Sequence, residues 1–212
     1  MKSGYTHVSM LLDRSGSMDS IKSDTIGGVN QFINIQKKEP GEMTLTLCQF
    51  DNEYETVYNM RPISEIPNLT EQTYIPRGST ALLDSACQLI IDTGKQLATM
   101  PIDNRPERVM VVIITDGEEN ASHQHTRQNL ADMVKHQEDV YKWQFVYIGA
   151  NQDSFAEGVK MGMHGVNYEA SSGGTAAMYS AVAKNVSVNR KAAPGEKKSL
   201  EQKDIDEELI AK

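Results

Sequence analysis

The sequence predicts an α/β fold: a doubly wound, mostly parallel sheet with helices on both faces and one antiparallel edge strand. Three observations predict it. Amphipathic helical segments alternate with short apolar segments along most of the chain. Residues 108–115, RVMVVIIT, are almost continuously apolar and β-branched, which is typical of a strand covered on both faces. Residues 43–51 and 54–60 alternate apolar and polar side chains, which predicts one antiparallel hairpin.

The first half of the chain begins with a strand, a helix and this hairpin. Residues 6–12, THVSMLL, form a short apolar segment and predict a buried strand. Residues 19–38 repeat apolar side chains at helical spacings, and Pro40-Gly41 ends that helix. Asp51-Asn52-Glu53 forms the hairpin turn. The three prolines of residues 61–79 predict a segment that is mostly loop.

The second half alternates helices and strands, as a parallel sheet requires. The expected elements, in chain order, are a helix over 81–100 that ends before Pro101, the strand 108–115, a helix over 125–140, a strand over 143–149, a short helix over 151–162, a strand over 165–169 and a helix over 173–192.

A chain of 212 residues fits one domain with a substantial core, which we place over residues 1–193. Residues 194–212 are rich in charge and sparsely apolar, with only a weak helical stripe. We expect a solvated C-terminal tail there; a helix that docks on a partner is the alternative.

Composition excludes several classes of protein. A net charge of −8 argues against a nucleic-acid binder, which needs a basic face. No apolar stretch approaches the roughly 20 residues of a membrane span, and the N-terminus has no signal-peptide core. Cys48 and Cys87 have no partner at disulfide or zinc-site spacing, which favours two reduced core thiols in a cytoplasmic protein.

Oxygen-bearing side chains follow the predicted strands at their carboxyl ends, where parallel sheets form their binding sites. The first strand runs into Asp13, Ser15 and Ser17, and the strand 108–115 runs into Asp116. Thr80 stands just before the helix 81–100. Two carboxylates and three hydroxyls make a hard-oxygen shell suited to Mg²⁺ or Mn²⁺, whereas zinc is not favoured because no histidine or cysteine is needed.

Each part has a simpler explanation when taken alone. Asp13 and Ser17 could form a turn and cap the following helix, Thr80 could cap the helix 81–100, and Asp116-Gly117 is a common turn dipeptide. All three parts together, at strand ends that face one crevice, favour the metal site.

The same residues carry a family resemblance. Asp-Arg-Ser-Gly-Ser at 13–17 fits the DxSxS pattern of von Willebrand factor type A domains. Thr80 in GSTALLD and Asp116 in TDGEEN resemble the other two parts of that family's metal-ion-dependent adhesion site (MIDAS), in the same order, although GST stands where many relatives have GGT. The resemblance covers roughly residues 5–190, and the family's Rossmann-like fold agrees with the predicted sheet.

The resemblance implies roles for these residues. Ser15, Ser17 and Thr80 would be hydroxyl ligands of Mg²⁺ or Mn²⁺, and Asp13 and Asp116 would bind the ion directly or through water. The open coordination position would take an Asp or Glu of a partner protein. Compact bacterial and phage relatives work with AAA+ ATPases or in complex assembly, so an AAA+ ATPase or a host or assembly protein is the expected kind of partner.

We expect partner contacts on a rim around the ion, at Met18, Ser79, Glu118, Glu119 and Asn151. Packing at a helix start is the alternative for Met18, and a solvated acidic loop is the alternative for the two glutamates. We also expect Asp13 and Thr80 to be exposed, so that replacing them leaves the domain folded.

The expected function is therefore a Mg²⁺-dependent adaptor and not an enzyme. A metal-dependent hydrolase or phosphatase that uses the same acidic crevice is the alternative. The sequence has no GxSxG, GxxxxGK[ST] or HExxH motif, and no histidine or lysine accompanies the metal motif to act as a base.

Overall fold

Six strands form one sheet in the order β3-β2-β1-β4-β5-β6 in the computed structural model, which describes residues 1–150, 154–193 and 195–211. Neighbouring strands are parallel except for the β2–β3 hairpin at one edge. The strands are β1 (Lys2–Asp13), β2 (Glu42–Phe50), β3 (Tyr54–Pro62), β4 (Pro106–Thr115), β5 (Gln144–Ala150) and β6 (His164–Tyr168). This confirms the predicted fold class.

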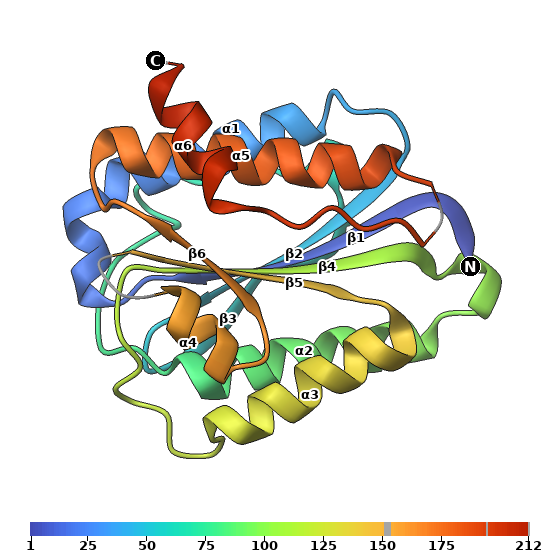
Figure 1. Cartoon of the computed structure of the whole chain (residues 1–212), viewed down its shortest axis with the longest axis horizontal. Coiled ribbons are helices and arrows are strands. Elements are labelled where there is room, and N and C mark those ends of the chain that lie inside the picture. The colour runs from blue at the N-terminus through green and yellow to red at the C-terminus, as the bar shows by residue number, and fades with distance from the viewer. Residues whose placement is uncertain (151–153, 194, 212) are drawn as a thin grey trace.

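Helices cover both faces of the sheet, with α1, α5 and α6 on one face and α2, α3 and α4 on the other (Figure 1). Their bounds are α1 (Lys22–Gln36), α2 (Leu82–Thr99), α3 (Arg127–Tyr141), α4 (Ser154–Lys160), α5 (Ser172–Lys191) and α6 (Gln202–Ile210). Three short 3₁₀ helices are η1 (Gly16–Ile21), η2 (Ile63–Glu65) and η3 (Ile102–Asn104). None of the helices in the described part of the chain is long and apolar enough to cross a membrane.

The core consists of two apolar layers, one on each side of the sheet. Strand β1 contributes to both, because successive side chains of a strand point to opposite faces. Met10 and Leu12 join the layer under α1 and α5, and Leu11 joins the layer under α2 and α3. Both cysteines are buried and free, as the sequence predicts.

The expectation of a solvated tail is wrong. Leu200 and Ile205 are buried at 1% and 4% exposure, and α6 packs against α5 (Figure 1). The Nδ2 atoms of Asn185 and Asn189 on α5 both donate to the main-chain oxygen of Lys198, at 3.0 and 2.8 Å. The segment therefore docks on the domain even though its apolar stripe is weak.

The tail also protects one edge of the sheet. The main-chain N–H of Asn167 in β6 donates to the Gln202 side chain (2.9 Å), and Gln202 Nε2 donates back to the main-chain oxygen of Asn167 (3.1 Å). A side-chain amide thus makes the pair of hydrogen bonds that another strand would make, and edge strands are commonly covered in this way.

Candidate metal centre

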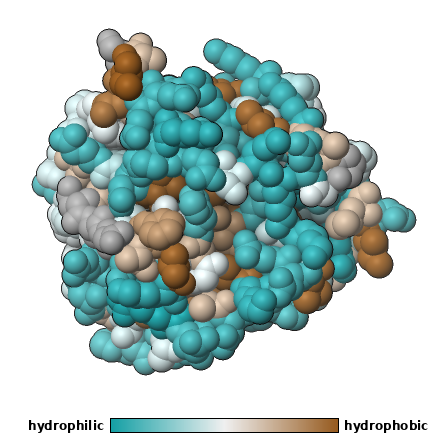
Figure 2. Space-filling view, in the orientation of Figure 1, coloured by the Kyte–Doolittle hydropathy of each residue, from teal (hydrophilic) through white to brown (hydrophobic). Residues whose placement is uncertain are grey.

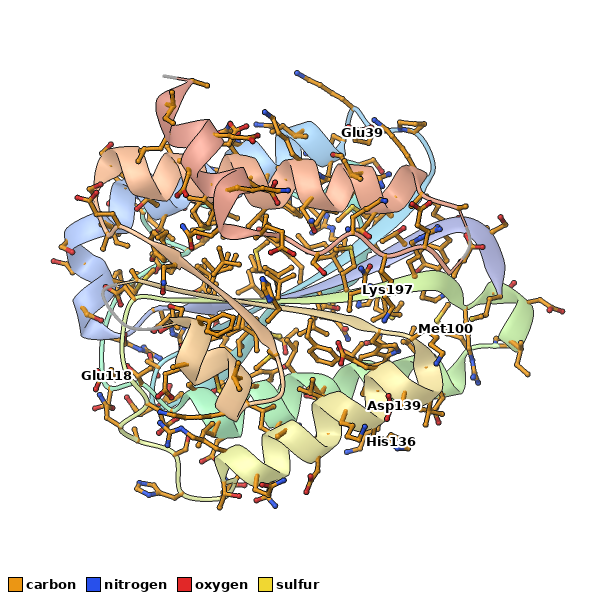
Figure 3. The ribbon with its side chains drawn as sticks, viewed as in Figure 1. Glu39, Met100, Glu118, His136, Asp139 and Lys197 are labelled. Carbon is orange, nitrogen blue, oxygen red and sulfur yellow. The ribbon has the colours of Figure 1, made fainter. Side chains whose placement is uncertain are left out.

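The carboxyl ends of β1 and β4 lie at the same edge of the sheet, and the structure brings all five predicted ligands to that edge. Asp13 ends β1, Ser15 and Ser17 lie in the loop and η1 that follow, and Asp116 directly follows β4. Glu118, two residues further along, is labelled at this edge in Figure 3. Thr80 reaches the same place from the loop before α2.

Hydrogen bonds link the serines to the second carboxylate. The hydroxyl oxygens of Ser15 and Ser17 share a hydrogen bond of 3.1 Å. The Ser17 hydroxyl donates to Asp116 Oδ1 at 2.6 Å. Two strands that meet the site from different parts of the chain are thereby joined through their loops.

Gly117 shows how closely the hydroxyls converge. A Cβ atom built on this residue would lie 3.1 Å from Thr80 Oγ1, 3.4 Å from Ser17 Oγ and 3.7 Å from Ser15 Oγ. Three hydroxyl oxygens therefore surround one point, and a side chain at residue 117 would enter the space between them.

Asp13 is held rigidly under this cluster and is fully buried. Its Oδ1 accepts from the Ser15 N–H at 2.6 Å, and its Oδ2 accepts from the Thr115 hydroxyl. The Tyr74 hydroxyl donates to its main-chain oxygen at 2.6 Å. Burial, with a smaller effect from the Asp116 charge, raises the pKa of Asp13 to about 6 despite these hydrogen bonds.

The donor set fits a small divalent cation. Burial also raises the pKa of Asp116, although the hydrogen bond from Ser17 lowers it, so burial disfavours the ionised form of both carboxylates. A cation beside them would favour the ionised form, and oxygen-only donors suit Mg²⁺ or Mn²⁺. Within the described ranges, no group of three or more His, Cys, Asp or Glu side chains could hold a metal ion, so the hydroxyls are essential to this site.

The capping explanations for Ser17 and Thr80 fail in the structure, whereas Asp13 does form a turn with the Ser15 N–H. Ser15 is the N-cap of η1 and makes no side-chain cap hydrogen bond, while Ile21 and Ala81 occupy the N-cap positions of α1 and α2. Neither Ser17 nor Thr80 therefore caps a helix. Their hydroxyl groups lie close to each other and do not bond to a helix end.

Comparisons with known proteins agree with this geometry. No family model and no curated protein matches the chain. Among solved structures, it is similar to a von Willebrand factor type A protein from Catenulispora acidiphila (15% identity, TM-score 0.57, 86% of this chain and 42% of that one). It is also similar to proximal thread matrix protein 1 from the mussel byssus with a zinc-occupied MIDAS motif (14%, 0.58, 87% and 46%), and to the corresponding domain of the pilus tip protein Mfa5 from Porphyromonas gingivalis (10%, 0.62, 91% and 98%).

The chain has the von Willebrand factor type A fold. It spans less than half the length of the first two of these structures and almost all of the Mfa5 domain.

In this type A fold, the loop before α2 is held by the loop after β4. The Thr80 N–H donates to Asn120 Oδ1 at 2.9 Å, and the Thr80 main-chain oxygen accepts from the N–H groups of Asn120 and Ala121. Asp84 accepts from three consecutive N–H groups of residues 123–125, which ties the first turn of α2 to the loop after β4. These contacts fix the position of the Thr80 main chain relative to the loop that carries Asp116.

The rim of the site differs in part from the expectation. Ser79 and Glu118 are exposed, as a partner contact requires. Met18 is fully buried in the core, because η1 turns it inward, so the prediction that it contacts a partner is wrong. Glu119 accepts hydrogen bonds from Leu83 N, Ala121 N, Ser122 N and Ser122 Oγ, which makes it an anchor of its loop. Asn151 lies outside the described residues.

Two predicted ligands are also less exposed than expected. Asp13 and Thr80 are 0% and 3% exposed, so the expectation that they lie open to solvent is wrong. Their replacement therefore disturbs the core as well as the site. Ser17, which is exposed, is the better position for a test of metal binding.

Sequence reasoning missed the residues that hold the ligands. Thr115 and Tyr74 bind Asp13, and an ionic cluster around Asp51 binds the motif loop through Arg14. Asp51 is fully buried; burial alone would raise its pKa, but the hydrogen bonds from Arg77 and the Glu53 N–H and the charge of Arg14 hold that pKa below its usual value. The signal was present: an arginine inside the DxSxS motif and acidic residues in the hairpin turn.

Proposed function

We propose that this chain is a protein-binding module that depends on a divalent cation, Mg²⁺ or Mn²⁺. Ser15, Ser17 and Thr80 would hold the ion through their hydroxyl oxygens, with Asp13 and Asp116 as carboxylate ligands, direct or through water. The observation that carries this proposal is the convergence of the three hydroxyl oxygens near Gly117, beside the buried carboxylate of Asp13 and the partly buried carboxylate of Asp116.

The same residues favour an acidic partner. An ion held mainly by neutral hydroxyls keeps most of its positive charge, and it supplies a coordination position for an anionic oxygen. The side chain of an Asp or Glu on a partner protein provides such an oxygen. Ser17 and the rim residues Ser79 and Glu118 are exposed around this position, so a partner can reach it.

The comparisons support the metal and the kind of activity. One solved structure with this fold has zinc in its MIDAS motif, and another is a domain of a pilus tip protein. The family resemblance of the motif, and not these structures, suggests an AAA+ ATPase or a host or assembly protein as the partner.

We propose a role without catalysis, which the chemistry around the carboxylates supports. The side chains that donate to the carboxylates of Asp13 and Asp116 belong to Thr115 and Ser17, and none of the hydrogen bonds described for these carboxylates comes from histidine or lysine. The site therefore offers an electrophilic ion without a general base in contact. Incubation with Mn²⁺ and generic phosphoesters should give no turnover above background; turnover that Asp116→Asn abolishes would establish the hydrolase.

Titration with Mn²⁺ tests the metal site directly. We expect one weak site in the wild type, and loss of binding in Ser17→Ala and Asp116→Asn. Ser64→Ala provides a matched control, because Ser64 is an exposed serine of η2 remote from the motif loops in the sequence. Binding that is unchanged in Ser17→Ala and Asp116→Asn would place the ion elsewhere.

A second experiment tests the use of the ion. A partner captured in Mg²⁺ should be released by EDTA, should bind Ser17→Ala at least 10-fold more weakly, and should lose affinity when its own contacting Asp or Glu becomes Asn or Gln. A partner that binds equally in EDTA does not use the ion.

A further inference from the structure

Thr80 does not lie at the end of a strand, so the sheet alone does not place its hydroxyl beside the serines. Its loop is tied to two neighbours, the motif after β1 and the β2–β3 turn. The main-chain hydrogen bonds are Gly16 N to Gly78 O (3.2 Å), Arg77 N to Arg14 O (2.7 Å) and Ala81 N to Asp51 O (2.9 Å). The position of the third hydroxyl ligand therefore depends on the contact between these three segments.

An ionic cluster centred on the buried Asp51 carboxylate closes the same contact. Asp51 Oδ2 accepts from Arg14 Nε at 3.0 Å and from Arg77 Nε at 2.8 Å. Asp51 Oδ1 accepts from the Glu53 N–H at 2.6 Å, which fixes the carboxylate in the turn. Arg14 and Arg77 also reach Glu55 and Glu53, at 2.5 and 2.8 Å. We call Arg14, Asp51 and Arg77 the clasp.

Each member of the clasp comes from a different segment, and two of them adjoin proposed ligands. Arg14 stands between Asp13 and Ser15 in the DxSxS motif, and its side chain is 6% exposed. Arg77 lies three residues before Thr80. Asp51 is fully buried between them and joins both arginines through one oxygen atom.

We propose that the clasp positions the Thr80 hydroxyl against those of Ser15 and Ser17, and thereby sets the affinity of the site for a divalent cation. The proposal rests on the proposed function, because it concerns the same site. In this role Arg14, Asp51 and Arg77 are positioning residues: they touch the loops that carry the ligands and not the ion.

The chemistry of the clasp suits positioning better than stability. A buried ion pair as a whole contributes little net stability, because the desolvation of its charges offsets their attraction, although removal of one partner alone is destabilising. Arg14 even keeps one buried N–H group, at Nη2, without a hydrogen bond acceptor. What a planar guanidinium provides is direction, since its donors lie in a rigid fork, and lysine does not reproduce that geometry.

The test measures the Mn²⁺ dissociation constant of purified variants by titration calorimetry, with Mn²⁺ alone as the probe. Side chains that orient metal ligands typically change affinity by about 10- to 100-fold when replaced, so we expect at least a 10-fold weaker site in Asp51→Asn and Arg14→Gln. Arg14→Lys keeps the charge but should rescue little of this loss. Arg77→Gln should give a smaller loss of affinity. Because the Arg77 side chain is 53% exposed, this variant should fold, so its loss of affinity does not arise from misfolding.

Arg108→Gln is the matched control. Its side chain is 9% exposed, it pairs with Glu107 and donates to the Ala192 main-chain oxygen, and it lies on β4 well before the carboxyl end of that strand. It should lower the melting temperature and leave the Mn²⁺ dissociation constant unchanged. A double variant of Arg14→Gln with Asp51→Asn should bind Mn²⁺ about as weakly as the weaker single variant, because the clasp acts as a unit.

The outcomes separate the two proposals. A wild type that binds no Mn²⁺ refutes the metal site itself, and the clasp with it. A wild type that binds Mn²⁺ while the clasp variants bind it equally tightly overturns the clasp alone. The clasp is also overturned if Arg108→Gln weakens binding as much as Asp51→Asn does, because the effect is then general destabilisation.

Discussion

Removal of residues 195–212 should destabilise the domain strongly, because this segment docks on α5 and β6. Leu200 and Ile205 are almost fully buried. Full burial of such a side chain contributes about 1.5–3 kcal/mol, so the two together contribute roughly 3–6 kcal/mol. The hydrogen bonds from Asn185 and Asn189 to Lys198 add about 1 kcal/mol each. The free energy of unfolding should thus fall by roughly 5–8 kcal/mol, a large share of the total of a typical domain.

Urea or thermal unfolding of the full chain and of the shortened chain measures this difference. For a domain of this size, each kcal/mol shifts the melting temperature by about 2–4 °C, so a fall of at least about 10 °C is expected. Two leucines of the segment give a matched pair of point variants. Leu200→Ala should cost about 2–5 kcal/mol, whereas Leu209→Ala, at a position 47% exposed, should cost about 0.5 kcal/mol or less.

The docking would be refuted by a shortened chain that melts within about 2 °C of the full chain. Equal effects of Leu200→Ala and Leu209→Ala would refute it too, since the argument depends on the difference in burial between the two side chains. Removal of residues 209–211 alone, which are all exposed, should leave the melting temperature nearly unchanged.

Two further predictions concern the site and the core. Gly117→Ala should abolish Mn²⁺ binding in a titration, because the added methyl group lies close to the three hydroxyl oxygens. It should change the free energy of unfolding by about 1 kcal/mol or less, since φ of Gly117 lies outside the left-handed region. Gly27→Ala, with open space at its Cβ, should bind Mn²⁺ as the wild type does, and tight binding by Gly117→Ala would contradict the proposed position of the ion. Burial of His7 lowers its pKa from 6.5 to about 4, so the unfolded chain takes up a proton in that range while the folded chain does not, and stability falls by about 3 kcal/mol as the pH decreases from about 6.5 to 4. Urea titrations at several pH values should show this loss in the wild type relative to His7→Gln; the raised pKa of Asp13 acts in the opposite direction but is common to both proteins, and identical pH profiles would contradict the neutral His7.

The sequence alone predicted the elements whose periodicity is strong. The continuous apolar run of β4 and the alternation of β2 and β3 identified a central strand and the antiparallel hairpin, because such patterns depend only on neighbours along the chain. The helix expected over 19–38 instead begins as η1 and becomes α1 at Lys22. The chain must first turn Ser17 outward toward Asp116 and Met18 inward to the core, and helical periodicity carries no information about that turn.

The C-terminal tail shows what local sequence patterns do not predict. Its apolar stripe is weak because only Leu200 and Ile205 of its apolar side chains are buried. The rest of the docking consists of side-chain amides that bind main-chain groups, such as Gln202 against Asn167 of β6. These contacts join residues that lie far apart along the chain, so no local pattern of hydrophobicity or charge reveals them. The clasp also joins distant segments; the sequence shows its charged residues, the arginine inside DxSxS and the acidic hairpin turn, but not which of them pair.

The raised pKa values of the two carboxylates and the arrangement of the hydroxyls favour cation binding at this site. Asp13 and Asp116 both have raised pKa values, so holding the two carboxylates ionised in this place costs stability at neutral pH. The Ser17 hydroxyl offsets part of that cost through its hydrogen bond to Asp116, and neither Ser17 nor Thr80 stabilises a helix end. A turn or a cap would need neither the buried charge nor the convergence of three hydroxyls beside it. A cation at this place makes use of both, since it neutralises the carboxylates and takes the hydroxyl oxygens as ligands, and the exposed Ser17 leaves its open side to a partner.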